Sequence, residues 1–540
     1  MMRIKLLQIN IFAISLIVFI LLSCGKEEEE IAKNRYISVI DNSIVNLSED
    51  GGVTKIRVTS SNTLWKIKVG EPISGVNYIR SASPDYGGST TKENESTEVR
   101  IYYNANSNYD LNKQPVIIQS LDGEISDTVI FTQKAKEKRV VSLRIDPSET
   151  FQTITGFGGA NAIWGNDYLN ESEMDLALDI EGNSLGFSIF RIRLPSNKNE
   201  WPGLVNTIKY ANSKNVIVLA TPWSPPAQWK SNNSIVGGGY LLKEHYGDFI
   251  TYINEFIQYM KKNNAAIDVV SLQNEPDLQV SYEGCEYTSE EMLDLVKNYA
   301  GEITGAKVLA AECFNFKQNY TDQILNDPIA VNNLNIIGGH IYGCVIENYP
   351  LAEDKDKEVW MTEHLLNLDS GNTPLNWTST TKKSIIWNES MEMVDEIQQG
   401  LQCNWNAYIW WYIRRYYSFL GDGERGTDRG TVLKRGYAIS HFSKYIRPGF
   451  VRIETNLINS SSKFQATAFK GATQYVLVLS NSEDYAISNV NINIPSNNGT
   501  IISYTSTVDD NRRFEELTKE EDSIVIDVES KSVKTIIIEK

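Results

Sequence analysis

Eight short apolar segments in the middle of the 540-residue chain constrain its fold more than any other feature. Amphipathic stretches such as Tyr246–Lys262 and Ser289–Ala300 lie between them. Apolar strands that alternate with helices are typical of a parallel sheet that is covered on both faces. Eight such units in succession predict an α/β fold, a (β/α)8 TIM barrel. The segments are 157–161, 187–194, 216–221, 269–272, 308–313, 336–342, 359–362 and 408–411.

The chain on either side of this barrel shows strand patterns and turn residues but little helical periodicity. Residues 35–134 alternate polar and apolar positions between Gly, Asn and Ser, which predicts an N-terminal β-sandwich. A charged run at residues 134–139 is typical of a linker. Residues 448–540 predict a C-terminal side β-sandwich next to the barrel of residues 140–447, and residues 140–150 are candidates to join it.

The N-terminal sandwich has a family resemblance of its own. The strings Gly51-Gly52-Val53, Ser61-Asn62-Thr63-Leu64-Trp65 and Phe131-Thr132-Gln133 resemble the BACON domain of carbohydrate-active enzymes. That resemblance leaves two roles open. The domain can bind glycan, or it can act as a spacer that holds the rest of the chain away from a surface.

The N-terminus has the features of a targeting segment. Residues 1–23 combine a basic start with a long apolar run, and a Leu-Leu-Ser string precedes Cys24 in the manner of a bacterial lipobox. We expect a signal peptide at residues 1–23 and lipidation of Cys24, with an uncleaved membrane anchor as the alternative. The acidic linker of residues 24–34 resembles the export tag of bacterial surface lipoproteins. These features predict a secreted lipoprotein of the outer membrane, exposed at the cell surface.

Charge and cysteine spacing argue against several kinds of partner. The formal net charge is −17, which disfavours nucleic acid and anionic lipid, so a lipid anchor is the one membrane contact that we expect. The spacings of Cys285, Cys313, Cys344 and Cys403 match no zinc or redox motif. We therefore expect no metal and no other cofactor, and we expect a monomer.

Two glutamates lie at positions where TIM-barrel enzymes have their active-site residues. Glu275 follows the fourth predicted strand within Asn274-Glu275-Pro276, and Glu363 ends the seventh within Thr362-Glu363-His364. Active sites of TIM barrels lie at the carboxyl ends of the strands, so both carboxylates should face the barrel mouth. Glycoside hydrolysis needs such a pair, because one carboxyl protonates the leaving oxygen while the other attacks the anomeric carbon or activates water. A lone glutamate could equally form an ion pair, but two at these positions favour catalysis.

Several motifs taken together resemble glycoside hydrolase family 30. The resemblance runs from about residue 140 to the C-terminus. It implies a retaining mechanism, with Glu275 as acid/base and Glu363 as nucleophile, and a side β-domain that packs on the barrel. The motifs are Gly156-Phe157-Gly158-Gly159, Pro222-Trp223-Ser224-Pro225-Pro226, the two glutamate motifs above, Trp410-Trp411-Tyr412-Ile413-Arg414-Arg415, Arg435-Gly436-Tyr437 and residues 442–449.

Other residues near the strand ends are candidates for substrate binding. Asn274 can bond a sugar hydroxyl next to the reacting carbon, a contact that tightens in the transition state. Arg193 ends the second strand, where a cation can keep a nearby carboxylate ionised. Tyr342 should reach the nucleophile, whereas His340 is expected to be a satisfied residue of the barrel interior. Aromatic rings stack on sugars, and the candidate platforms are Trp164, Trp223 and Trp411.

Within the family, residues 407–417 resemble subfamily 8, the bacterial glucuronoxylanase branch. The resemblance implies that Arg415 and Tyr417 hold the methylglucuronate side group of xylan, and a guanidinium can grip a carboxylate through two hydrogen bonds. A structural ion pair is the alternative for Arg415. The sequence departs from the branch after the nucleophile, where Leu365 and Leu368 replace hydrogen-bond donors. That departure puts the requirement for glucuronate in doubt.

The sequence therefore predicts an endo-1,4-β-xylanase of the glucuronoxylanase type, with a polysaccharide as its partner. The alternatives are another family 30 activity, namely a β-1,6-glucanase, a glucosidase or an exo-acting xylobiohydrolase. A glycan-binding surface protein with a degenerate barrel is the alternative of another class. Two intact glutamates argue against that last interpretation.

Overall fold

The computed structural model describes residues 34–40, 43–136, 140–366, 377–495 and 499–540. The chain divides into one unit that ends at Arg139 and another that begins at Val140. Within the described ranges, no helix has the length and apolar character needed to cross a membrane. The predicted signal peptide, Cys24 and nearly all of the acidic linker lie outside these residues.

The first unit is a β-sandwich of two sheets. Its core contains Trp65 and Phe131 from one sheet, Val99 from the other sheet, and Tyr78 from a connecting segment. Alternate residues of strand β8 are buried, as expected for a strand with one face on a core. One sheet has the order β1 (Tyr36–Val39), β3 (Gly52–Ser61), β7 (Glu95–Tyr103), β5 (Ile79–Ser83). The other has the order β2 (Ile44–Leu47), β9 (Ser126–Gln133), β8 (Asn112–Ser120), β4 (Thr63–Val69), β6 (Tyr86–Ser89).

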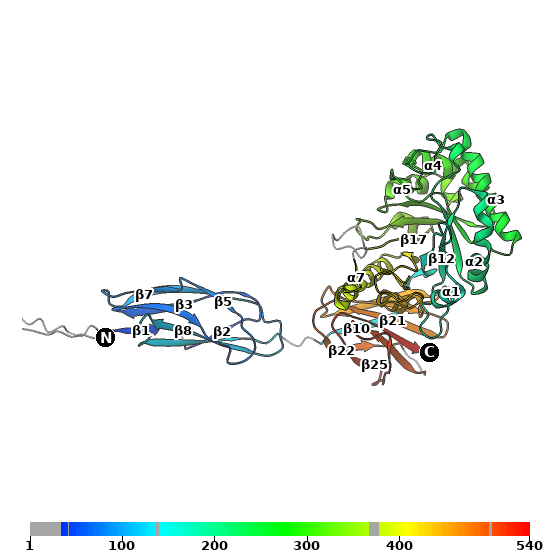
Figure 1. Ribbon diagram of the computed structural model, residues 1–540. Coiled ribbons are helices and arrows are strands. Elements are labelled where there is room, and N and C mark those ends of the chain that lie inside the picture. Colours follow the sequence, from blue (N-terminus) through cyan, green and yellow to red (C-terminus); the bar gives the residue numbers. More distant parts are fainter. Residues whose placement is uncertain (1–33, 41–42, 137–139, 367–376, 496–498) are drawn as a thin grey trace, which may run out of the picture. The chain divides into compact units, whose positions relative to one another are not determined.

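The second unit contains a closed parallel barrel, which confirms the predicted fold (Figure 1). Every barrel strand overlaps one of the predicted apolar segments. Residues from seven of the strands contact one another inside the barrel, among them Ile189, Leu309 and Trp360. The barrel interior away from the carboxyl ends of the strands is therefore a packed core. The strands are β11 (Gly156–Ala160), β12 (Ile189–Leu194), β13 (Ile217–Pro222), β14 (Val269–Ser271), β15 (Lys307–Cys313), β16 (Ile336–His340), β17 (Glu358–Glu363) and β18 (Ala407–Tyr412).

Helices cover the outside of the barrel. Helix α3 shows why: its apolar residues recur every three to four positions, so Phe249, Ile253, Phe256 and Met260 share one buried face. The helices are α1 (Glu171–Leu178), α2 (Trp201–Ser213), α3 (Tyr246–Lys262), α4 (Ser289–Asn298), α5 (Gln318–Asn326), α6 (Pro350–Asp354), α7 (Lys383–Gln402) and α8 (Lys434–Ser443). Short 3₁₀ helices occupy Lys198–Glu200, Ala227–Trp229, Lys243–His245, Ala300–Glu302 and Ala330–Asn333.

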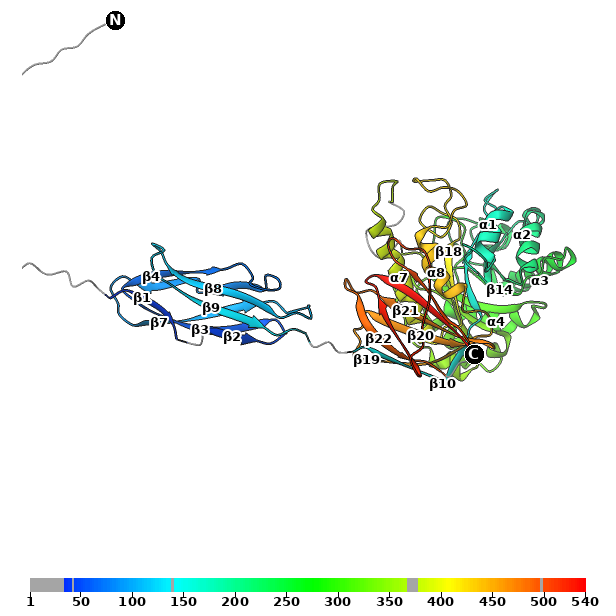
Figure 2. The same cartoon turned by 90° about the horizontal axis from the view of Figure 1, so that it is seen from below.

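A nine-stranded sheet packs on the barrel beside α7 and α8 (Figure 2). Strand β21 alternates between two cores: Leu477 and Leu479 join the core of the sheet, while Val476 and Val478 join the core of the barrel helices. Strand β10, which precedes the barrel in the chain, pairs with β19 and β22 and so belongs to this sheet. The sheet order is β24 (Arg513–Glu516), β23 (Ile501–Ser506), β26 (Ser532–Glu539), β21 (Gln474–Asn481), β20 (Phe464–Lys470), β19 (Val451–Ile458), β10 (Ser142–Thr153), β22 (Ile487–Asn493), β25 (Ser523–Val528).

His441 of α8 fastens the barrel to this sheet. It is fully buried, with Nδ1 2.8 Å from the Thr535 hydroxyl and Nε2 2.8 Å from the Ser506 hydroxyl. The Thr535 hydroxyl donates to the His441 carbonyl, so it accepts from Nδ1, and Nε2 must accept from Ser506. Burial, with a smaller contribution from Arg512, lowers the pKa of His441 to about 3. The fold therefore holds this imidazole neutral.

This histidine makes stability depend on pH. The unfolded chain protonates the imidazole below about pH 6.5 and the folded chain does not, so stability is lost as pH falls from about 6.5 toward 3. Between pH 7 and pH 5 the loss from His441 should reach about 2 kcal/mol. Urea denaturation of the wild type and His441→Asn at both pH values measures it. An equal pH dependence in the two proteins would contradict the argument.

Candidate active site

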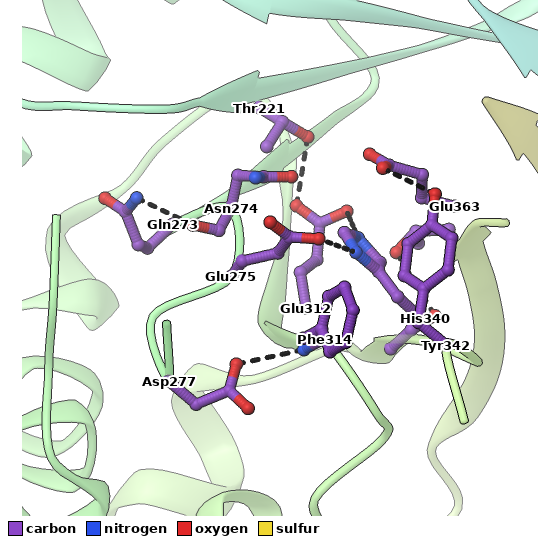
Figure 3. A network of polar contacts seen from close by, with 12 residues as sticks. Thr221, Gln273, Asn274, Glu275, Asp277, Glu312, Phe314, His340, Tyr342 and Glu363 are labelled. Atoms are coloured by element: carbon purple, nitrogen blue, oxygen red, sulfur yellow. Dashed lines mark hydrogen bonds and ion pairs between the residues drawn. The ribbon is translucent and has the colours of Figure 1, made fainter. Parts of the chain in front are cut away.

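Glu275 and Glu363 meet at the carboxyl ends of the barrel strands (Figure 3). Glu363 is the last residue of β17, and Glu275 follows β14 after a short turn. A carboxylate oxygen of each glutamate and a ring nitrogen of His340 all lie within 4.8 Å of one another. Both glutamates are buried. The backbone of Glu275 has a φ of +46°, and its N–H donates to the Glu312 carbonyl at 3.0 Å, which ties the turn to the neighbouring strand.

Two donors hold the carboxylate of Glu363. Arg191 contacts one oxygen at 2.6 Å, and the Tyr342 hydroxyl donates to the other at 3.0 Å. Burial raises the pKa of Glu363, and His340 and Arg191 oppose that rise. Tyr342 therefore lies where the sequence predicted, in contact with the expected nucleophile. With both oxygens engaged, the carboxylate is fixed in one orientation.

Arg191 organises the floor of the site. Its guanidinium is fully buried, and besides Glu363 it reaches the Asn274 amide oxygen at 2.8 Å and Glu312 at 3.2 Å. Because the amide oxygen accepts from Arg191, the amide nitrogen of Asn274 is left to donate elsewhere. This is the orientation that a bond to a sugar hydroxyl requires.

The arginine that contacts Glu363 is thus Arg191 and not Arg193. Arg193 contacts Glu283 at 2.9 Å and Glu200 at 2.8 Å, so it links two segments that follow the barrel strands. Strand residues two apart point to the same side, so a signal for Arg191 was present in the sequence: both arginines had to face the interior. The strand pattern could not say which of them reaches Glu363.

Glu275 is contacted by one buried and one exposed partner. His340 Nδ1 lies 3.1 Å from one carboxylate oxygen, and the Tyr282 hydroxyl lies 3.2 Å from the other. His340 is buried in the barrel interior, as expected, but it touches the proposed acid/base directly. Its Nε2 has no hydrogen-bond partner among the described residues, so the prediction that this histidine is fully satisfied is wrong. Its Nε2 faces a third carboxylate, Glu312, at 3.7 Å. Glu312 was not among the residues predicted from the sequence, although it is an acidic residue near the end of an apolar strand.

Glu275, His340 and Glu363 are close enough to hold a cation. The Arg191 guanidinium lies against the same carboxylate, and its charge repels a divalent ion at this distance. The hydroxyls of Tyr342 and Tyr282 occupy further oxygen lone pairs. The arrangement fits a general acid and a nucleophile better than a metal centre.

The three predicted tryptophan platforms lie together, Trp223 and Trp411 against Arg191 and Trp164 against Arg193. The ring centres of Trp164, Trp223 and Trp411 are 5.2 to 6.3 Å apart. Trp164 is 36% exposed and therefore accessible to a ligand, but Trp223 is 3% exposed. The platform role predicted for Trp223 is therefore wrong, because its ring is packed between its neighbours and the Arg191 guanidinium, 4.9 Å away.

Arg415 already has an anionic partner within the protein. Its guanidinium contacts Asp167 at 2.7 Å and lies 3.8 Å from the centre of the Tyr412 ring. Arg414 pairs with Asp167 as well. Tyr417 is nearly buried, as is Leu365, whereas Leu368 lies outside the described residues. The structural ion pair considered for Arg415 is thus present, and a substrate carboxylate would compete with it.

Comparisons with known proteins show the family of the chain. Residues 181–358 match the model of the glycosyl hydrolase family 30 TIM-barrel domain. The chain is 34% identical over 365 residues to the glucuronoxylanase XynC of Bacillus subtilis, which covers 66% of this chain and 81% of that relative. The chain belongs to glycoside hydrolase family 30.

Solved structures of the family superpose on most of the chain. The subfamily 8 xylanase Xyn30A of Clostridium acetobutylicum gives a TM-score of 0.64 at 28% identity, covering 74% of this chain and all of that one. A family 30 endoxylanase of Clostridium papyrosolvens gives 0.62 at 29% identity, with the same coverage. The barrel and the side sheet of the family 30 protein are therefore both part of a shared architecture.

Proposed function

We propose that this family 30 enzyme hydrolyses β-1,4 bonds of xylan by a retaining double displacement. One observation carries the mechanism: oxygens of Glu275 and Glu363 lie within 4.8 Å of each other. Retaining glycosidases place their carboxyls about 5–5.5 Å apart, whereas inverting enzymes leave about 6.5–9.5 Å for a water molecule. The similarity to a glucuronoxylanase and to two xylanases supports xylan as the substrate.

Glu363 and Glu275 have different roles in the two displacement steps. Glu363 attacks the anomeric carbon while Glu275 gives a proton to the leaving oxygen, and Glu275 then takes a proton from the water that releases the sugar. Arg191 and Tyr342 aim the attacking carboxylate. The Asn274 amide, held by Arg191, donates to the hydroxyl beside the reacting carbon. Trp164 and Trp411 are the proposed platforms for the flanking sugar units.

The side group of the substrate is the finer part of the proposal. Arg415 is partly exposed and can reach a methylglucuronate, with the Tyr417 ring beside it. Asp167 neutralises that arginine in the free enzyme. We propose that a glucuronate on xylan must displace Asp167, so that it aids binding without being required. The enzyme then cuts both decorated and undecorated xylan.

Product analysis tests both parts. Soluble enzyme lacking the first 25 residues is incubated with glucuronoxylan and with linear xylan, and products are identified by mass spectrometry. We expect cleavage of both by the wild type. Asp167→Asn removes the internal competitor and should raise the preference for glucuronoxylan by about 5- to 50-fold, since charged hydrogen bonds contribute about 1.5–3 kcal/mol, partly screened here.

The controls separate the alternatives. Arg415→Gln should abolish the gain in Asp167→Asn and leave cleavage of linear xylan unchanged. Strict dependence of the wild type on glucuronate would overturn the competition argument. Cleavage of neither xylan would overturn the substrate, and β-1,6-glucan and aryl glucosides would be tested next.

We also propose that the enzyme is tethered at the bacterial cell surface. The support is the basic and apolar segment before Cys24 and the acidic residues after it. The N-terminal β-sandwich would then act as a spacer between the lipid and the barrel. Labelling of intact cells with radioactive palmitate, followed by surface proteolysis, would show whether Cys24 carries a lipid and which side of the membrane the barrel faces.

A further inference from the structure

Glu312 is a third carboxylate in the barrel, and the double displacement does not use it. It lies near the end of β15, fully buried, with a backbone φ of +52°. The Thr221 hydroxyl donates to it at 3.1 Å, and Arg191 contacts it at 3.2 Å. Burying a carboxylate is costly, so a role that repays the cost is expected at the active site.

His340 connects this carboxylate to the acid/base. Its imidazole stands between Glu275, at 3.1 Å from Nδ1, and Glu312, at 3.7 Å from Nε2 (Figure 3). Both ring nitrogens thus face carboxylates, which favours the doubly protonated ring. Several charged or titratable groups surround His340 and Glu275. They are Glu312, Glu363, Arg191, Tyr342, Tyr282 and Cys313.

The charges around His340 outweigh its burial. Burial by itself would lower the pKa of His340, but Glu363, Glu275 and Glu312 raise it to about 9. Glu312 stays ionised, since Arg191 and His340 overcome its burial and lower its pKa to about 2. Three carboxylates face one buried arginine and one histidine, so a proton on the imidazole brings the cluster closer to neutrality.

The first step of the reaction needs that proton. Glu275 must deliver a proton to the leaving oxygen, and at a separation of 3.1 Å a proton can pass between His340 Nδ1 and the carboxylate. The Glu275–His340 pair then acts as one store that holds a single proton, gives it to the leaving group, and recovers it from water in the second step. The general acid is lost only when the pair loses this proton.

We propose that Glu312 is a positioning residue whose charge keeps this proton on the Glu275–His340 pair and so sets the upper pH limit of catalysis. The inference rests on the proposed roles of Glu275 and Glu363. It adds a third acidic residue, acting through His340, to the two that touch the substrate.

The test removes the charge of Glu312 and keeps the shape of its side chain. Glu312→Gln should move the alkaline limb of the kcat/KM profile on xylo-oligosaccharides to lower pH by at least one unit, with KM below the limb changed less than about twofold. Glu312→Asp retains a charge and should keep the limb near that of the wild type. Glu396→Gln is the matched control, because Glu396 is a partly buried acid 3.1 Å from another histidine, His364, and its limb should not move.

A second substrate tests whether the alkaline limb reflects protonation of the leaving group. A dinitrophenyl glycoside has a leaving group that needs no protonation, so its kcat/KM should show no alkaline limb in the wild type or in Glu312→Gln. An unmoved limb in Glu312→Gln on the oligosaccharides would overturn the proposal. A limb on the activated substrate that moves with Glu312→Gln would overturn it as well.

A direct reading of His340 keeps the inference testable if Glu312→Gln fails to fold. Nitrogen-15 NMR of the full chain, with His340→Asn for assignment, should find the imidazole of the wild type protonated at pH 8. A neutral imidazole at pH 7 would overturn the proposal. If the wild type cuts no xylan, the proposed function fails, but this measurement and the profile on any cleaved β-glycoside still decide the role of Glu312.

Discussion

Glu363→Gln is expected to lower kcat on the cleaved polysaccharide by about 10⁴-fold or more, because removal of a covalent nucleophile typically costs on the order of 10⁴- to 10⁶-fold. An amide cannot form the glycosyl–enzyme bond. It still fills the volume of the carboxylate, so the fold and KM should change little. Initial rates by reducing-sugar assay, with circular dichroism to verify folding, measure the effect. Glu396→Gln, which removes an acid of α7 that is hydrogen-bonded to His364 and Tyr408, should retain activity.

The stereochemistry of the product decides what Glu363 does. With the wild type, proton NMR of a fresh digest should show the β-anomer first, since two inversions restore the starting configuration. In Glu363→Gly, added azide should restore turnover and give the α-glycosyl azide, because the small anion attacks from the face that the side chain vacates. An α-anomer as the first product of the wild type would mean that Glu363 activates water and that the retaining mechanism is wrong.

Arg191→Met should destabilise the second unit by about 3–5 kcal/mol and abolish measurable activity. The guanidinium is fully buried and contacts Glu363 and Glu312, so its removal leaves two buried carboxylates without the cation that contacts both of them. Urea denaturation at pH 7 measures the first effect and reducing-sugar release measures the second. Arg191→Lys keeps the charge but cannot contact both carboxylates and Asn274 together, so it should fold and lose much of its activity.

A double variant separates electrostatics from packing. Adding Glu312→Gln to Arg191→Met removes one of the two unpaired carboxylates, so at least about 1 kcal/mol of stability should return. If the double variant is no more stable than Arg191→Met, the loss comes from the cavity. A change of less than 1 kcal/mol in Arg191→Met itself would contradict the account of the buried cluster.

Local patterns in the sequence determined the barrel and the position of its chemistry. Continuous apolar runs at strand length, separated by amphipathic helices, are compatible with few folds other than a parallel barrel, and each of the eight predicted runs overlaps a strand of the structure. Glu275 and Glu363 could be placed because each lies at the carboxyl end of its own strand or shortly beyond it. Parallel strands bring their carboxyl ends to one face, so residues far apart in sequence become neighbours by topology alone.

Only the tertiary structure decided which partners those residues have. Strand alternation sent both Arg191 and Arg193 inward, but their depth in the barrel separates them, and depth follows from the stagger between strands. The pairing of His340 with Glu312, and of Arg415 with Asp167 from a loop more than 240 residues away, likewise depends on side-chain reach across strands and loops. A linear pattern records the direction of a side chain but not its distance to another, and at this site charge pairing is a matter of distance.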